Sequence, residues 1–189
     1  MTADPACPEV DPARAAERQR QLADFEGFYL EHVELVRRVV ARLLGPRAGI
    51  DDAIQEVFIV AFRKRASYAG HALPSTWLYS IAKRVALSAR RQVRVRAWLG
   101  LDAAPEPTEP TTPDTVFEQR AAAAELYRLL DQLAEKKRTV WILHELEGLP
   151  GKTIATIVGC PLETVWTRLF HARRELQELA RAHADRSDP

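Results

Sequence analysis

The sequence has few of the features that define several large classes of protein. Cys7 and Cys160 are the only cysteines in 189 residues, which excludes a disulfide framework and favours a reducing compartment. No apolar run approaches the roughly 20 residues of a membrane-spanning helix, so we expect no direct membrane insertion. The N-terminus lacks the hydrophobic core of a secretory signal. We therefore expect a cytoplasmic protein.

The usual signs of catalysis are also missing. The five histidines are scattered without metal-ligand spacing, and the two cysteines have no ligand partners nearby. No phosphate-binding glycine loop and no nucleophile motif occurs. Glu145 and Glu147 lie two residues apart on a predicted helix, so they point in different directions and do not form a catalytic pair. We predict no metal site, no cofactor and no enzymatic activity.

The composition indicates helices. Hydrophobic residues make up 47% of the chain, as in globular proteins, and Ala, Leu, Val and Arg are abundant. No alternating apolar pattern of useful length predicts a strand. Apolar residues recur instead at helical spacing, for example over 24–44, 51–65 and 74–95. The sequence therefore predicts an all-α fold, made of two small helical domains.

A proline-rich acidic segment, "LDAAPEPTEPTTPDT", divides the chain and predicts an extended linker, because it has no apolar periodicity. The charge changes on either side of it. The segments 1–24, 25–98, 99–117 and 118–189 carry net charges of −2, +7, −4 and 0. We predict a disordered or partly helical tail at 1–21, a first domain at 22–98, a linker at 99–117, a second domain at 118–182 and a C-terminal tail at 183–189.

One predicted helix carries an unusual amount of positive charge. The stretch "IAKRVALSARRQVRVR" (81–96) has six basic residues and no acidic one. On a helical wheel of about 100° per residue, its aliphatic side chains fall on one side. The opposite side carries Lys83, Arg84, Arg90, Arg91 and Arg94. Two interpretations stay open: a surface for a phosphate backbone, or a solvated face with acidic neighbours elsewhere in the fold.

The second domain contains a helix-turn-helix pattern, "LEGLPGKTIATIVGCPLETVWTRLFHARREL". Gly159 suits the left-handed residue that ends a helix, and Pro161 suits the start of the next one. Val165, Leu169, Ala172 and Leu176 recur at spacings of four, three and four, which predicts the buried side of the longer helix. A helix-turn-helix places this helix in the DNA major groove, whereas an ordinary helical hairpin has the same pattern without that role.

Three motifs in order, "DDAIQEVFIVAF", "STWLYSIAKRVALSARR" and "LEGLPGKTIATIVGCPLETVWTRLFHAR", resemble an extracytoplasmic-function (ECF) sigma factor of the sigma-70 family. The resemblance implies two folded domains, region 2 and region 4. It also implies the partners: core RNA polymerase, promoter DNA and a cognate anti-sigma factor. The expected function is to direct the polymerase to particular promoters and initiate transcription, in response to a stress or envelope signal.

The resemblance also assigns roles to residues. Binding to core polymerase is assigned to Asp52, Gln55 and Glu56. Contact with the −10 element is assigned to Tyr68, His71, Trp77, Lys83, Arg84, Arg90, Arg91 and Arg94. Contact with the −35 element is assigned to Trp166, Thr167, Arg168, Phe170, His171 and Arg174. For Trp77 and Trp166 packing in the core stays an alternative to DNA contact.

The chain departs from the family pattern at several positions, so the promoter sequence is not predicted. Arg84 and Ser88 stand where the family commonly has Asn and Asp, and Pro150 and Lys152 where it often has Ser and Glu. Two other functions compete with the sigma factor. One is a helix-turn-helix regulator that acts without polymerase; the other is a helical interaction protein whose basic face binds an acidic partner. Neither requires the "DDAIQEVF" helix.

Overall fold

The all-α prediction is confirmed. The computed structural model describes residues 11–46, 49–100 and 114–187, and within these ranges the regular structure is helical throughout. None of the helices in these ranges combines the length and hydropathy needed to cross a membrane. The elements in chain order are α1 (Pro12–Gln21), α2 (Phe25–Leu44), α3 (Ile50–Lys64), η1 (Arg65–Ser67), α4 (Pro74–Trp98), α5 (Asp114–Leu130), α6 (Glu135–Trp141), the π-helical turn η2 (Ile142–Leu146), α7 (Gly151–Val158) and α8 (Leu162–Ser187).

The first domain is a bundle in which α2, α3 and α4 all pack against one another. Helix α2 begins where the sequence provides a cap: the Asp24 carboxylate accepts a hydrogen bond from the Gly27 amide at 3.0 Å. Most of the predicted apolar positions are buried, including Val36 and Val57. Phe62 lies four residues after the buried Phe58 but is 47% exposed, and the Arg65 guanidinium covers its ring at 3.6 Å.

The second domain contains the predicted helix-turn-helix. Gly159 ends α7 in the left-handed conformation, with φ 69° and ψ 50°. Helix α8 packs on both α6 and α7. The four positions predicted for its inner side are buried, namely Val165, Leu169, Ala172 and Leu176. The hydrophobic spacing of the sequence therefore gave the correct side of this helix.

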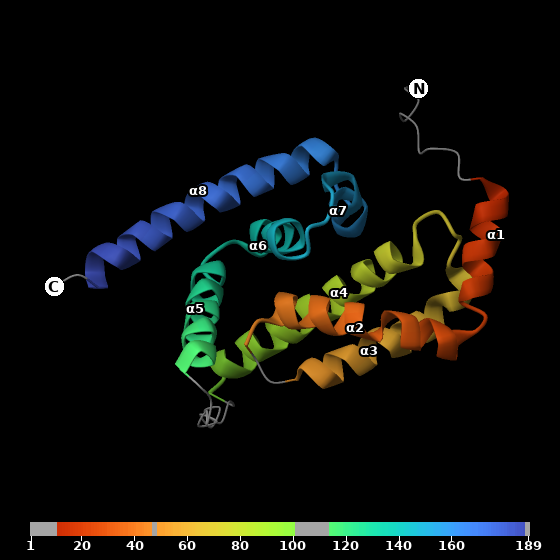
Figure 1. The fold of residues 1–189 in the computed structure, drawn as a ribbon, viewed down its shortest axis with the longest axis horizontal. Helices are drawn as coiled ribbons and strands as arrows, with labels where there is room; N and C mark the ends of the chain where they lie inside the picture. The colour runs from red at the N-terminus through yellow and green to blue at the C-terminus, as the bar shows by residue number, and fades with distance from the viewer. Residues whose placement is uncertain (1–10, 47–48, 101–113, 188–189) are drawn as a thin grey trace.

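The two domains lie against each other. Helix α4 contacts α7, and α2 contacts η2. Figure 1 shows α2 and α4 between α3 on one side and α6 and α7 on the other, with α1 and the end of α8 far apart. The buried apolar residues of both domains belong to one continuous cluster. This side-by-side arrangement positions every candidate functional residue discussed below.

Several helices extend across the expected domain boundaries. The C-terminal tail was expected from residue 183, but α8 continues to Ser187. Helix α5 begins at Asp114, inside the predicted linker 99–117; the greater part of that linker lies outside the described residues. Within the predicted N-terminal tail, 11–21 includes α1, which Asp11 caps through a 2.9 Å hydrogen bond from the Ala13 amide.

Helix α1 is fixed to the loop that precedes α4. The Gln19 side-chain amide donates to the Tyr68 carbonyl at 3.0 Å, and Arg18 donates to the Gly70 carbonyl at 2.9 Å. Gly70 has a positive φ of 74°, and a Cβ there would lie only 2.6 Å from the backbone oxygen of Ala15. The close approach of α1 therefore depends on the absence of a side chain at this position.

We expect Gly70→Ala to displace α1 from the loop. The matched control is Gly49→Ala, because Gly49 also has a positive φ, 92°, but its Cβ position has no atom within 4 Å among the described residues other than its chain neighbours. Both variants should lose about 1–2 kcal/mol of stability from left-handed strain. Hydrogen exchange of residues 12–21 should accelerate only in Gly70→Ala. Equal protection of α1 in the two variants would show that its docking does not depend on Gly70.

Candidate nucleic-acid interface

The three residues expected to bind polymerase lie together on the surface of α3. Asp52, Gln55 and Glu56 are all exposed and share one face, because residues three and four apart in a helix are neighbours. The opposite side of α3 is buried through residues such as Ile54 and Val57. Helix α3 therefore packs on the core with one side and exposes polar side chains on the other, as a docking surface requires.

An open groove of about 790 Å³ runs between α3 and α4. Its α3 wall carries Asp52 and Glu56, and its α4 wall carries Arg84, Ser88 and Arg96. The groove thus has carboxylates on one side and guanidinium groups on the other. Arg84, which was predicted to contact the −10 element, lies beside the predicted polymerase-binding residues and is exposed.

The loop before α4 does not present both of its predicted DNA-binding residues. His71 is exposed, but Tyr68 is only 4% exposed, and its hydroxyl donates to the Ala72 carbonyl. Burial raises the pKa of Tyr68. In this structure the Tyr68 ring packs on Trp77 and offers little surface to a base, so its contact with the −10 element stays a prediction.

Trp77 lies partly buried against the core, with its ring centroid 5.1 Å from that of Tyr68. The tilted contact between the two rings is typical of core packing. Of the two interpretations left open for Trp77, the structure favours core packing. It joins the loop to α4 rather than standing free on the surface.

The positive side of α4 is not an open surface in this structure. Arg90 is only 6% exposed, and the Lys83 ammonium group donates to the Ile157 carbonyl of α7 at 2.7 Å. Burial, and then the neighbouring Arg84, lowers the pKa of Lys83. Arg91 and Arg94 remain exposed but both pair with Glu135, at 3.8 and 3.3 Å. The second domain therefore covers Lys83 and Arg90 of the face that was predicted to bind DNA, whereas the side chains of Arg91 and Arg94 stay 60% exposed.

The outer side of α8 is accessible. Thr167 and Arg174 are exposed, and Arg168 and His171 are partly buried. Phe170 is 62% exposed, with its ring centroid 5.5 Å from that of His171. Arg168 is directed back toward the turn, where it donates to the Cys160 sulfur at 3.4 Å. The residues predicted to read the −35 element thus share one surface, with Phe170 its most exposed aromatic side chain.

Trp166 has a different environment from Phe170. A Cβ on Gly151 would lie 2.5 Å from the Trp166 ring, so the indole packs directly against the start of α7. The ring centroid of His144 lies 5.7 Å away, edge to face. Trp166 is nevertheless 45% exposed. The structure supports the packing alternative for one face of this ring and leaves the other face accessible.

The sequence did not identify the residues that join the two domains. The Glu147 side chain, which is 1% exposed, accepts hydrogen bonds from Arg42 at 2.7 Å, Arg38 at 3.2 Å and the Tyr79 hydroxyl at 3.1 Å. The hydrogen bond with Glu147 raises the pKa of Arg38. Burial, followed by the Glu147 charge, raises that of Tyr79. The residues of this cluster come from three separate elements, so they leave no helical periodicity in the sequence.

The fold and the exposed surfaces define a class of protein. A helix-turn-helix with an accessible second helix, joined to a basic helical domain, is typical of proteins that bind DNA to control transcription. Comparisons with known proteins agree with this class. The sequence matches the profile of sigma-70 region 2 over residues 28–96 and that of sigma-70 region 4 over residues 123–176.

Curated relatives specify the group within that family. The Escherichia coli ECF RNA polymerase sigma-E factor is 30% identical over 150 residues, which is 75% of this chain and 78% of that protein. The ECF RNA polymerase sigma factor SigE of Mycolicibacterium smegmatis is 28% identical over 174 residues, or 88% of this chain, which spans only 65% of the length of that relative. The chain belongs to the ECF group of the sigma-70 family of sigma factors.

Two solved structures have the same fold. CnrH, determined in complex with the cytosolic domain of CnrY, superimposes with a TM-score of 0.64 at 18% identity and covers 91% of this chain and 97% of its own. RpoE from Bartonella quintana, in complex with the anti-sigma factor NepR, gives a TM-score of 0.61 at 23% identity, over 84% of this chain and 97% of its own. The likeness therefore extends over both domains.

Proposed function

We propose that the chain binds core RNA polymerase, directs it to specific promoters and initiates transcription there. The proposal rests on two features that occur together in this ECF family member. One is the exposed set of carboxylate and amide side chains on α3, and the other is the accessible helix-turn-helix. A regulator that acts without polymerase requires only the second of these. The groove beside Asp52 and Glu56 supports the first domain as the polymerase-binding one.

The proposal divides promoter recognition between the two domains. The −10 element belongs to the first domain, with His71 and Arg84 exposed for contact and the covered side of α4 available after the domains separate. The −35 element belongs to the exposed side of α8. Base contacts there would specify sequence, whereas contacts from arginine to phosphate would set position and strength.

Two further expectations accompany this function. An anti-sigma factor is a proposed partner, supported by the solved structure of the similar sigma factor RpoE in complex with the anti-sigma factor NepR. The absence of enzymatic activity stays a prediction. The relatives are named as sigma factors, and the described residues contain no group of three His, Cys, Asp or Glu that could hold a metal ion.

The first test concerns polymerase binding. The double variant Asp52→Arg, Glu56→Arg should no longer co-elute with core enzyme in gel filtration. It should therefore also fail in run-off transcription from the DNA upstream of the gene that encodes the chain. The control is Asp51→Arg, because Asp51 also lies in the first turn of α3 but pairs with Arg37 at 3.1 Å. This control should keep both activities. A parental protein that neither co-elutes nor supports any transcript would instead favour the regulator without polymerase.

The second test concerns readout of the −35 element. Because Phe170 is largely exposed, Phe170→Ala should change stability by less than about 0.5 kcal/mol. It should relax the preference at one promoter position by roughly 1–3 kcal/mol, as expected for a lost base contact. Trp166→Ala removes packing on Gly151 and should lower stability. A library randomised through the −35 element, transcribed with core enzyme, measures the preference; an unchanged profile for Phe170→Ala would remove Phe170 from the base-reading set.

A further inference from the structure

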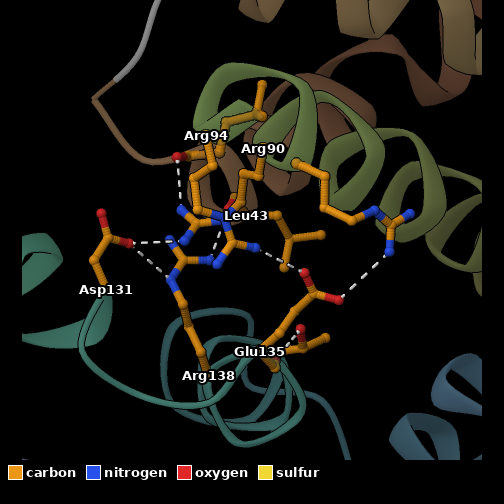
Figure 2. Close-up of polar contacts among 9 residues, drawn as sticks. Leu43, Arg90, Arg94, Asp131, Glu135 and Arg138 are labelled. Carbon is orange, nitrogen blue, oxygen red and sulfur yellow. Dashed lines mark hydrogen bonds and ion pairs between the residues drawn. The ribbon is translucent and has the colours of Figure 1, made fainter. Parts of the chain in front are cut away.

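The loop between η1 and α4, residues 68–73, carries His71, which is exposed and is proposed to contact the −10 element. It precedes Pro74, the first residue of α4. An acidic group of the second domain, Glu135, pairs with Arg94 of α4 at 3.3 Å (Figure 2). Arg94 lies 20 residues after Pro74, which is about 30 Å along a helix. The loop is therefore at the end of α4 that lies away from this ion pair.

The residues of the loop alternate between buried and exposed positions. Tyr68 and Gly70 are buried, whereas Ala69, His71 and Leu73 are exposed. Gly70 lies near the centre of the loop and has a positive φ of 74°. Because each φ angle sets the direction of the chain that follows it, the outward direction of His71 and Leu73 depends on the backbone conformation at Gly70.

Helix α1 binds the backbone of this loop before and after the turn at Gly70. The side-chain amide of Gln19 donates a hydrogen bond to the Tyr68 carbonyl at 3.0 Å. The Arg18 guanidinium donates to the Gly70 carbonyl at 2.9 Å and to the His71 carbonyl at 3.5 Å. A single helix therefore restrains the peptide groups that determine where the exposed side chains of the loop point.

Helix α1 is itself attached to the first domain. Leu22, which follows its last residue, is 2% exposed and belongs to the hydrophobic core. A helix of ten residues is only marginally stable alone, so α1 depends on such contacts. The sequence match to sigma-70 region 2 begins at residue 28, after α1 has ended. That match therefore assigns no role to this helix.

We propose that Arg18 and Gln19 are positioning residues for −10 recognition, which hold the loop in the conformation that directs His71 outward to the DNA. The inference rests on the proposed function, because it concerns how the chain reads a promoter. An unrestrained loop must lose conformational freedom each time it makes a base contact. A loop that is held in advance avoids this cost and binds the preferred base more tightly.

The test compares two double variants of the full chain. Arg18→Met with Gln19→Met removes the hydrogen-bond donors to the loop but keeps side chains of similar length. The control, Arg20→Met with Gln21→Met, makes the same substitutions at the next two positions of α1. Both control residues are exposed, and Arg20 pairs with Glu17 inside the helix at 3.4 Å. Circular dichroism checks that both variants remain folded, and NMR order parameters of residues 69–72 should fall only in the first variant.

The decisive measurement is transcription by core enzyme from one promoter library randomised through the −10 element and another randomised through the −35 element. Arg18→Met with Gln19→Met should lower the discrimination at one or two −10 positions by about three- to tenfold, as expected when a hydrogen bond that restrains the loop is lost. Its −35 preference and its co-elution with core enzyme should match those of the parental chain, because α8 and α3 are unchanged.

Two further variants test the same loop independently. Arg18→Lys keeps a donor for the Gly70 carbonyl and should retain most of the −10 discrimination, whereas Arg18→Met alone should not. Gly70→Ala acts from the loop side, since its Cβ would lie 2.6 Å from the backbone oxygen of Ala15. It should change the preference at the same −10 positions as Arg18→Met with Gln19→Met.

The outcomes separate this inference from the proposed function. A parental −10 profile in Arg18→Met with Gln19→Met, or an equal change in the control, would overturn the positioning role. A uniform loss of transcript with an unchanged profile would also overturn it, because a helix that only stabilises the fold acts in that way. Specific transcript from the parental chain with core enzyme supports the proposed function whatever the variants do. If the parental chain gives no transcript, the proposed function fails, and the positioning role fails with it.

Discussion

A cation that is removed from water fixes the arrangement of this molecule. Arg138 belongs to the second domain, is 1% exposed, and hydrogen-bonds to a carbonyl at the end of α2 in the first. Arg90 reaches the next carbonyl of that helix end from α4, and Asp131 lies between the two guanidiniums. A buried guanidinium tolerates few environments. The contact therefore selects one relative position of the domains and brings α7 onto α4.

Much of the fold could be predicted from the sequence, because helical periodicity reports which side of a helix is buried. The spacing of Val165 and Leu169 gave the inner side of α8, and Gly159 gave the turn before it. For α4, helical periodicity identified only one of the two buried sides. Its second buried side contains Arg90, which a hydrophobic pattern counts as polar. The long aliphatic stems of arginine allow such a side chain to pack inside an interface.

The exposure of candidate site residues could be predicted from the sequence where one helix alone determines it, and less well where packing between two elements determines it. Asp52, Gln55 and Glu56 share an exposed face because of their spacing alone. The burial of Tyr68 could not be predicted, because α1, distant in sequence, lies against its loop. The role of Glu147 was missed because its partners, Arg38, Arg42 and Tyr79, lie about 70 to 110 residues earlier. Pairings across such separations leave no local signal in the sequence.

The central claim is that this member of the ECF group directs core RNA polymerase through two exposed surfaces, the acidic motif on α3 and the outer side of α8. The most direct measurement is transcription from a library of duplex promoters by core enzyme with the parental chain or with the Asp52→Arg, Glu56→Arg variant. The account predicts promoter-specific transcript with the parental chain and none with the variant. Specific transcript at the parental level with the variant would contradict it.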